Sequence, residues 1–377
     1  MKKIILAPDS FKGSLTAIEV CEILDQVIHK QFPKCEIVQM PLSDGGEGFV
    51  DCLLAAVGGE RILVRVNGPM GKAIEAAYGV LPDGCAVIEM AAASGLTLVN
   101  RDERNPLQAT TLGTGQLIRH ALDQGCRELV IGLGGSATTD GGAGAASALG
   151  IRYLTQEGRE ILSGSNLAQL DHIDISRMDG RLAESTIIFA CDVTNPLYGP
   201  NGAACVFGPQ KGANPEQVQS LDKGLEKLRS VVLQQTGIDV QSLHGSGAAG
   251  GLTVPFVAFC GAQIGSGLDF MLDVAGFDSA LIGADLVVTG EGRTDGQSAM
   301  GKVLSGVGAR AKRREVPVLA ISGSLDKGYE QLYAGGITSM FAALQAPQAL
   351  EDAMAHAREN LTRAAENIFR LMRSIDR

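Results

Sequence analysis

The chain has 377 residues, a formal net charge of −10, 45% hydrophobic residues and 20% charged residues. This length exceeds what one compact core normally supports, so we expect two domains. The acidic balance, the 4% of aromatic residues and the lack of Trp argue against nucleic acid or an anionic membrane as a partner.

The cysteines and the N-terminal segment both favour a cytoplasmic location. None of the eight cysteines forms a C-x-x-C pair, and no histidine-rich stretch lies beside them, so a zinc site is not expected. The first apolar run stops at Pro8-Asp9, which is too short for a signal peptide, and no run of 18 apolar residues occurs. Such cysteines are typical of buried thiols in a reducing cytosol.

The first part of the chain predicts two strand–helix pairs. Residues 3–8 predict a buried strand, and Thr16-Ala17-Ile18-Glu19 is a capping box that begins a helix. A second strand at 36–40 leads through a glycine-rich loop into a helix at 50–57. This alternation is typical of the start of a parallel sheet.

The remaining elements are predicted by buried apolar runs and by helical spacing. In the middle of the chain we expect strands at 128–133 and 187–191, and a helix from Pro215 to about Gln235 with Asn214 as its N-cap. Towards the C-terminus we expect strands at 284–289, 316–321 and 339–344, helices near 301–314 and 328–334, and one long helix at 348–374.

These elements predict an α/β protein of two domains. Neither end of the chain has enough strands for a sheet, but two strands from the front and three from the back make five, a normal doubly wound parallel sheet. We therefore predict a discontinuous domain of residues 1–65 and 281–377, with a second α/β domain of residues 66–280 inserted into it.

Two loops near the N-terminus follow predicted strands, which is where open α/β sheets bind ligands. The first contains Ser10 and Lys12, and its cation suits a carboxylate or a phosphate, although a solvated surface lysine would look the same. The second, Asp44-Gly45-Gly46-Glu47-Gly48, allows a close backbone approach and offers a carboxylate for a hydroxyl or for Mg²⁺. A simple turn with solvated acids is the alternative.

A glycine-rich run at 132–144 follows the strand at 128–133. Its backbone N–H groups, at Gly134, Gly135 and Ser136 above all, are suited to surround phosphates. The same residues also fit G-x-G-x-x-A, so a dinucleotide-binding turn is an alternative. The second strand and ribose-binding acid that such a turn requires are not clear in the sequence.

Asp192 directly follows the strand at 187–191, where it could act as a base or a metal ligand, or begin an Asx-turn before Asn195-Pro196. Downstream, Lys211 adds a cation in a turn. The five histidines are scattered and pair with no Ser or Cys motif, so a His-based triad is not expected.

The loop after the strand at 284–289 contains an arginine between two acids. Arg293 is suited to bidentate contact with an oxyanion, and Glu291 and Asp295 are suited to Mg²⁺. The following segment 296–303 fits G-x-x-x-x-G-K but has Val303 where a P-loop needs Ser or Thr, so we predict that it is not a P-loop. Lys302 can still meet a phosphate. Together the loops supply donors, cations and acids without a redox centre, which favours phosphoryl transfer.

At these loops the chain resembles the bacterial glycerate kinase family. The matching segments occur in order: APDSFKGSL (7–15), DGGEG (44–48), IEMAAASGL (88–96), RNPLQATTLGTG (104–115), GLGGSATTDGGAG (132–144), ACDVTNPL (190–197), FGPQKGA (207–213), GAAGG (247–251), TGEGRTDGQ (289–297) and GK (301–302). Departures include Gln116, where the family usually has Glu.

The resemblance implies a flavodoxin-like domain built from both termini, an inserted α/β domain, and a site in the cleft between them. It also implies ATP and Mg²⁺ as co-substrates and D-glycerate as the acceptor, with 2-phosphoglycerate favoured over 3-phosphoglycerate as the product. The residues leave open a nicotinamide-dependent dehydrogenase, a two-lobed sensor of small anions, and a homo-oligomer.

Roles follow from combining the resemblance with the loops. Lys12 and Arg293 are predicted to hold the glycerate carboxylate or the transferred phosphoryl group, Asp192 to act as base, and Asp44 to orient the hydroxyls. The remaining expectations are Ser10, Gly45 and Gly46 for substrate, Gly134, Gly135, Ser136, Lys211 and Lys302 for ATP, and Asp295 with Glu291 for the metal.

Overall fold

The computed structural model describes residues 1–299 and 302–375. The chain forms two compact units. Unit 1 comprises Met1–Asp44, Asp51–Gly58 and Ser266–Arg377, and unit 2 comprises Gly45–Val50 and Gly59–Gly265. Within the described residues, none of the helices has both the length and the apolar composition that a bilayer crossing requires.

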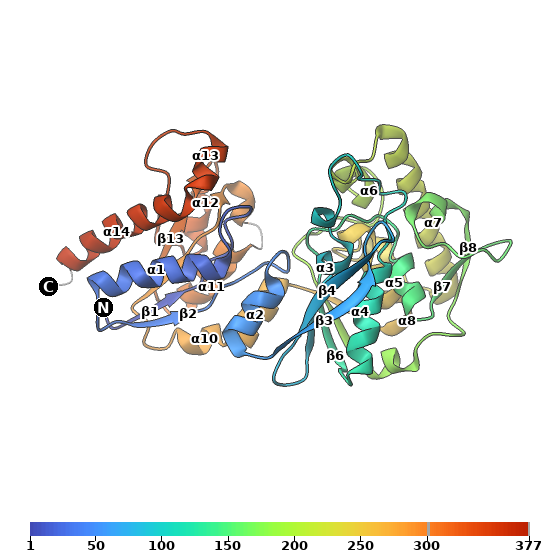
Figure 1. Cartoon of the computed structure of the whole chain (residues 1–377), viewed down its shortest axis with the longest axis horizontal. Coiled ribbons are helices and arrows are strands. Elements are labelled where there is room, and N and C mark those ends of the chain that lie inside the picture. Colours follow the sequence, from blue (N-terminus) through green and yellow to red (C-terminus); the bar gives the residue numbers. More distant parts are fainter. Residues whose placement is uncertain (300–301, 376–377) are drawn as a thin grey trace. The chain divides into compact units, whose positions relative to one another are not determined.

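Unit 1 contains a five-stranded parallel sheet whose strands come from both ends of the chain (Figure 1). In spatial order the strands are β15 (Ser339–Ala342), β13 (Val318–Ser322), β11 (Leu286–Thr289), β1 (Lys3–Leu6) and β2 (Glu36–Gln39). Ile4 of β1 lies opposite Leu286 of β11 on one side and Ile37 of β2 on the other. The prediction that the two termini build one parallel sheet is confirmed.

The burial of this sheet explains why its central strands read as unbroken apolar runs. Ile4, Ile5 and Leu6 are fully buried, because a parallel sheet is covered by helices on both faces. Ile4 and Leu6 share a core with buried residues of α1 (Ala17–Gln31) and α14 (Ala357–Ile375), and α11 (Val303–Arg313) packs against β11 and β13.

Helix α1 begins where its capping box predicts. The Thr16 hydroxyl accepts a hydrogen bond from the Glu19 backbone N–H at 3.2 Å, and the Glu19 carboxylate accepts one from the Thr16 N–H at 2.9 Å. The other elements of unit 1 are α2 (Phe49–Val57), α9 (Gly267–Val274), α10 (Phe277–Ala280), α12 (Gln331–Gly335), α13 (Leu350–Ala355) and a small pair of strands, β12 (Arg293–Thr294) and β14 (Ser324–Leu325).

The prediction of one long helix at 348–374 is wrong. The chain forms α13 and α14 instead, with His356 between them in a non-helical conformation. Apolar residues at helical spacing continue on both sides of this break, and no glycine or proline marks it. The sequence therefore carries none of the usual signals for the interruption.

Unit 2 contains a six-stranded mixed sheet. Its spatial order is β10 (Gln263–Gly265), β9 (Thr186–Ala190), β6 (Glu128–Gly132), β5 (Ala86–Glu89), β4 (Ala73–Val80) and β3 (Glu60–Asn67). The first four strands are parallel, and β4 and β3 continue the sheet antiparallel. A separate antiparallel pair joins β7 (Arg152–Thr155) to β8 (Leu170–Asp174). The predicted strands at 128–133 and 187–191 are confirmed.

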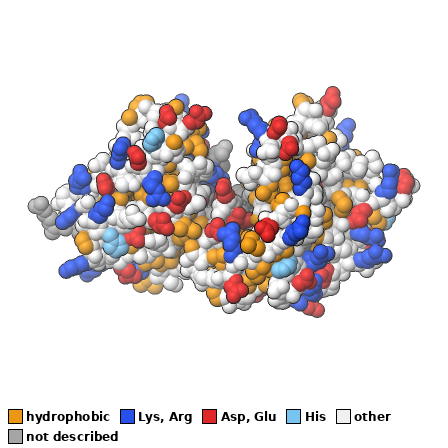
Figure 2. All heavy atoms as spheres, viewed as in Figure 1, with side chains coloured by type: hydrophobic (Ala, Val, Ile, Leu, Met, Phe, Trp, Pro, Cys, Tyr) orange, Lys and Arg blue, Asp and Glu red, His pale blue; other side chains and the backbone are white. Residues whose placement is uncertain are grey.

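The helices of unit 2 share one apolar core with its sheet. They are α3 (Ala91–Ser94), α4 (Leu112–Asp123), α5 (Ala143–Ala148), α6 (Ala203–Phe207), α7 (Pro215–Thr236) and α8 (Thr253–Cys260). Helix α7 starts at Pro215 with Asn214 as its N-cap, as predicted. On the face shown in Figure 2, acidic and basic side chains are interspersed over both units, without a large patch of one sign.

Candidate active site

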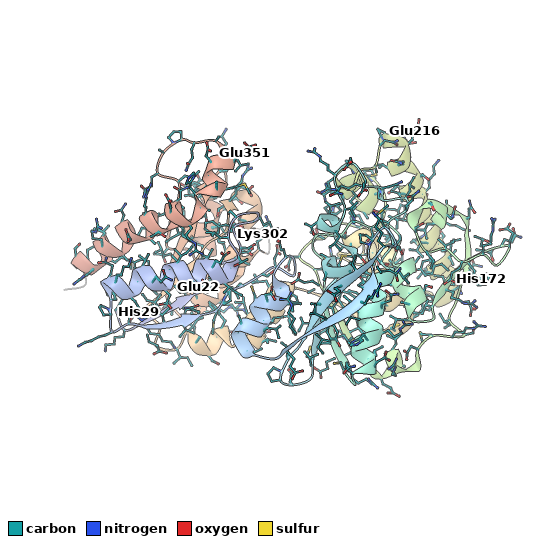
Figure 3. All side chains as sticks on the ribbon, in the orientation of Figure 1. Glu22, His29, His172, Glu216, Lys302 and Glu351 are labelled. Carbon is teal, nitrogen blue, oxygen red and sulfur yellow. The ribbon has the colours of Figure 1, made fainter. Side chains whose placement is uncertain are left out.

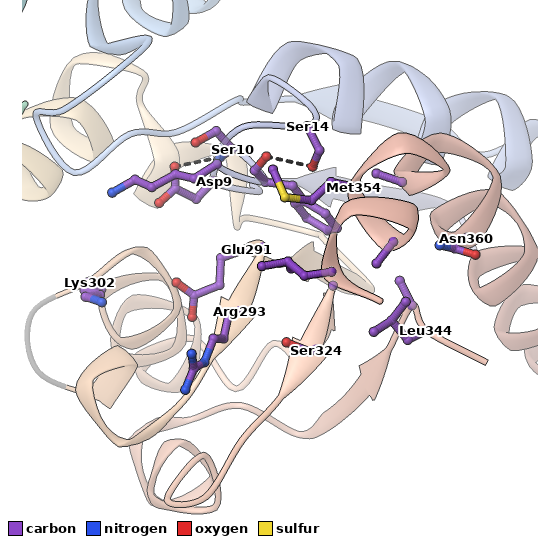
Figure 4. A pocket seen from close by; sticks show the side chains of 18 of the residues that line it. Asp9, Ser10, Ser14, Glu291, Arg293, Lys302, Ser324, Leu344, Met354 and Asn360 are labelled. Carbon is purple, nitrogen blue, oxygen red and sulfur yellow. Dashed lines mark hydrogen bonds between the residues drawn. The ribbon is translucent and has the colours of Figure 1, made fainter. Parts of the chain in front are cut away.

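Unit 1 contains a pocket of about 370 Å³ at the carboxyl ends of its parallel strands. One part of its lining is charged and consists of Asp9, Lys12, Asp44, Glu291, Arg293 and Lys302. The other part is mostly apolar and includes Phe11, Leu344, Leu350 and Met354. Figure 4 shows this division, with Asp9, Glu291 and Lys302 towards one side and Leu344, Met354 and Asn360 towards the other.

The loops after β1 and β11 form the charged side because they run on together beyond the sheet. The Asp9 N–H donates to the Gly290 carbonyl at 2.8 Å, and the Thr289 hydroxyl donates to the Ala7 carbonyl at 2.8 Å. These bonds continue the pairing of the two strands into their loops. Residues almost 300 positions apart in the sequence therefore line one pocket.

Asp9 is the pocket residue that the sequence argument missed. Its side chain is only 8% exposed, and its carboxylate accepts a hydrogen bond from the Ser10 N–H at 2.6 Å. The pKa of Asp9 is raised to about 7, first by burial and then by the charge of Asp44, while the Ser10 N–H and Lys12 lower it. The position just past a buried strand, which singled out Asp44 and Asp192, also describes Asp9.

Glu291 lies across the pocket from Asp9 and is held by its own loop. It is 7% exposed, and its carboxylate accepts a hydrogen bond from the Thr294 hydroxyl at 3.0 Å. Burial raises the pKa of Glu291, while hydrogen bonds from Ser298 and Thr294 oppose that effect. Its carboxylate is thus fixed within the lining of the pocket.

Arg293 lines the pocket but is already paired with acids of its own unit. Its guanidinium lies 2.5 Å from Asp326 and 3.8 Å from Asp295, and 64% of its side chain is exposed. Lys302, labelled in Figure 3, is the residue before α11 and lies at the start of that helix. In the segment 296–303, which fits G-x-x-x-x-G-K but is predicted not to be a P-loop, Met300 and Gly301 lie outside the described residues.

A second group of predicted residues meets in unit 2, at the carboxyl ends of β6 and β9. The Gly134 N–H donates to the Gly45 carbonyl at 3.3 Å, and a Cβ placed on Gly134 would lie 2.5 Å from the Gly46 Cα. A Cβ placed on Gly45 would lie 3.2 Å from the carbonyl oxygen of Ala190, and Ala190 stands two residues before Asp192 in the sequence. The structure therefore brings Gly45 and Gly46 together with the loop of Gly134, Gly135 and Ser136.

Two N–H groups of the glycine-rich run at 132–144 bind a carboxylate of the run itself. Asp140 is fully buried, and its carboxylate accepts hydrogen bonds from the Thr111 N–H and hydroxyl, each at 2.8 Å. It also accepts from the N–H groups of Gly142, at 3.1 Å, and Gly144, at 3.3 Å. Burial raises the pKa of Asp140, and these hydrogen bonds oppose the rise. Elsewhere in the run, the Ala137 N–H donates to the Ser94 carbonyl and the Gly141 N–H donates to the Gly250 carbonyl.

Lys211 is buried beside the same run. It is 2% exposed, and its ammonium donates to the Thr138 carbonyl at 2.6 Å. Burial lowers the pKa of Lys211 to about 7, against the effect of the Asp140 charge. The turn at 132–137 does not lead into a helix as a dinucleotide-binding turn does, since α5 begins only at Ala143.

The acids and histidines of the described chain bear on its ability to hold a metal ion by side chains alone. In the ranges 1–299 and 302–375, no three His, Cys, Asp or Glu side chains are grouped in a way that could hold a metal ion. No histidine lines the pocket among these residues, and His29 and His172, labelled in Figure 3, lie on exposed positions of α1 and β8. Mg²⁺, however, commonly binds through one or two carboxylates together with phosphates of the substrate. The acids of this pocket could supply such carboxylates.

The comparisons with known proteins agree over the whole chain. The model of the glycerate kinase family matches residues 4–373. A glycerate kinase of Bacillus cereus is 46% identical over 368 residues, covering 97% of each chain, and a glycerate 2-kinase of Escherichia coli K12 is 43% identical with the same coverage. The chain belongs to the glycerate kinase family.

The fold leads to the same family. A crystal structure from Salmonella typhimurium LT2, presented as a candidate glycerate kinase 2, superimposes with a TM-score of 0.86 at 43% identity and covers all of both chains. The similarity between the two structures extends over both units, because the superposition covers 100% of this chain. A nicotinamide-dependent dehydrogenase and a non-enzymatic sensor, the alternatives from sequence, have no support in these comparisons.

Proposed function

We propose that this chain transfers the terminal phosphoryl group of ATP to D-glycerate, with 2-phosphoglycerate as the product. The observation that carries the proposal is the family match over residues 4–373. The pocket of unit 1 supports it, because it combines the cations that bind a carboxylate or phosphate with acids that can receive a hydroxyl proton. A relative named glycerate 2-kinase supports the 2-phosphate over the 3-phosphate.

The substrate roles divide between the two groups of residues. Lys12 and Arg293 would hold the glycerate carboxylate or the moving phosphoryl group, with Ser10 and Asp44 directed to the hydroxyls. Arg293 would have to exchange its ion pair with Asp326 for the anion, which is feasible because its side chain is largely exposed. The Gly45 and Gly46 backbone, which belongs to unit 2, stays a prediction for substrate binding.

ATP would bind through the N–H groups of Gly135 and Ser136, whereas the Gly134 N–H, also predicted for ATP, already donates to the Gly45 carbonyl. Lys302, in unit 1, stays a prediction for a phosphate. Lys211, predicted as an ATP contact, would act mainly through the Thr138 carbonyl that it holds, because its ammonium is buried. Asp192 as the base stays a prediction. It belongs to unit 2, at the end of β9.

Mg²⁺ fits Glu291 in the 289–295 loop. Glu291 presents a carboxylate to a pocket in which Asp9 and Asp44 add further negative charge, and a cation would offset their repulsion. We therefore propose Glu291 for the metal, whereas Asp295, which is not part of the pocket's lining and lies 3.8 Å from Arg293, stays a prediction. When bound, Mg²⁺ would neutralise charge on the β- and γ-phosphates of ATP.

Three further points remain proposals. We infer that unit 1 is a flavodoxin-like domain, since its strands counted along the chain have the order 2-1-3-4-5. We infer that unit 2 is a domain inserted into it; the predicted boundaries at 65/66 and 280/281 compare with unit boundaries at 58/59 and 265/266. A cytoplasmic location suits an ATP-dependent enzyme in which no disulfide joins the cysteines of the described chain.

The test is direct. The purified protein should release ADP from ATP and Mg²⁺ only when D-glycerate is present. Supplying the product to enolase without a mutase should give phosphoenolpyruvate, because only 2-phosphoglycerate reacts. ADP release without an enolase signal would change the product to 3-phosphoglycerate, and no glycerate-dependent ADP release would refute the proposal.

A further inference from the structure

The acid nearest to the end of the central strand β1 has no part in the roles predicted from sequence. Asp9 is separated from Leu6 by two residues and lines the pocket of unit 1. Ligands of open α/β sheets bind beyond the carboxyl ends of such strands. Asp9 therefore occupies the position in the fold where a reacting group is most often found.

Asp9 is also held in a fixed place. Its backbone is tied to Gly290 at 2.8 Å, and one carboxylate oxygen accepts from the Ser10 N–H at 2.6 Å. Within the described residues it forms no ion pair at 4.0 Å or less, whereas Arg293 in the same pocket has two acidic partners. A buried carboxylate that is not neutralised by an ion pair is costly to keep, which points to a use for it.

We propose that Asp9 is a catalytic residue whose carboxylate receives the proton of the glycerate hydroxyl during phosphoryl transfer. This rests on the proposed function. The hydroxyl O–H bond breaks as the oxygen forms its bond to the γ-phosphorus of ATP. The bond between that phosphorus and the bridging oxygen breaks, and its electron pair leaves on the β-phosphate of ADP. The proton stays on Asp9 until product release returns it to water.

The surroundings of Asp9 suit this role better than those of the other pocket acids. The groups that face it are Asp44, Glu291 and Lys12, with Arg293 and Lys302 elsewhere in the lining. Hydrogen bonds from Thr294 and Ser298 hold the Glu291 carboxylate, and those bonds favour its charged form. Burial and the Asp44 charge raise the pKa of Asp9, which makes its carboxylate a stronger proton acceptor.

The experiment compares three single variants with the wild-type protein in the glycerate-dependent assay. Asp9→Asn keeps the shape and removes the base, Asp192→Asn tests the residue predicted from sequence, and Asp102→Asn is a control at an exposed acid outside the pocket. We expect Asp9→Asn to lower kcat by about 10²–10⁴-fold with a much smaller change in KM. Calorimetry with glycerate should show that binding is retained.

A pH profile separates a base from a merely structural residue. Because the base must be ionised to receive a proton, wild-type kcat/KM should fall at acidic pH, and Asp9→Asn should lose this acidic limb. Near-normal kcat in Asp9→Asn, or loss of activity in Asp192→Asn alone, would overturn the inference while leaving the kinase activity intact. If Asp9→Asn fails to fold, the wild-type profile still decides, since the lack of an acidic limb would refute the role. An inactive wild-type protein would instead refute the proposed function.

Discussion

Replacing Asp9 with Asn should make the protein more stable at pH 8. The pKa of Asp9 rises from its ordinary 3.8 to about 7 on folding, mainly because the side chain is buried. At about 1.4 kcal/mol for each pKa unit, keeping this carboxylate charged in the folded state costs about 4 kcal/mol, which is an upper bound. Asn has a similar shape and no charge to bury, so the variant avoids this cost.

The sign of the pH dependence follows from the direction of the pKa change. A raised carboxyl pKa favours the protonated folded state, so its contribution to stability is complete below pH 3.8 and is lost as the pH rises to about 7. The difference between Asp9→Asn and wild type should therefore be largest at pH 8 and shrink towards pH 5. Calorimetric unfolding at both values measures it. Equal stability at pH 8, or a less stable variant, would refute the burial argument.

Three further predictions concern the other residues of the site. Gly134→Ala should destabilise the protein by about 1–3 kcal/mol and impair catalysis, because the new Cβ would lie 2.5 Å from the Gly46 backbone. Gly180→Ala is the control, because its Cβ would have no atom within 4 Å, and thermal melts and kcat measure the difference. Arg293→Lys should lower kcat/KM nearly as much as Arg293→Ala, because lysine lacks the bidentate fork, and each loss should correspond to about 1.5–3 kcal/mol of transition-state stabilisation. Wild-type kinetics in both variants would remove Arg293 from the site. The pKa of Lys211 is lowered to about 7 on folding, so its contribution to stability grows as the pH rises from 7 to 10. Thermal melts of Lys211→Met should lack this rise, and a rise of wild-type size in the variant would contradict the lowered pKa of Lys211.

The fold could be predicted where local signals were strong. The Thr16–Glu19 capping box and the Asn214 cap both mark helix starts that the structure confirms. The five-stranded sheet followed from counting strands at the two termini. The β3–β4 hairpin was missed although its exposed and buried residues partly alternate and the loop between its strands, residues 68–72, contains two glycines and a proline. The break at His356 has no local signal at all.

The candidate site was harder to predict, because its important contacts join distant residues. The sequence suggested that the 132–144 run binds an external phosphate, but the Asp140 carboxylate takes two of its donors, the Gly142 and Gly144 N–H groups. A carboxylate inside a glycine-rich run satisfies the same donors as a ligand, so composition alone cannot distinguish the two. Likewise, Lys211 bonds to Thr138 across 73 positions, and its burial becomes visible only when the chain is folded.

The order of the chain also affects how this protein can fold during synthesis. β1 and β2 leave the ribosome first, yet β1 lacks its neighbour β11 until about 280 residues later. At about 5–20 residues per second, that delay lasts roughly 14–56 seconds. Most of unit 2 is the continuous segment Gly59–Gly265, which is complete during this interval. The apolar N-terminal strands must therefore stay soluble while a later part of the chain matures, so aggregation or chaperone binding is expected to begin there.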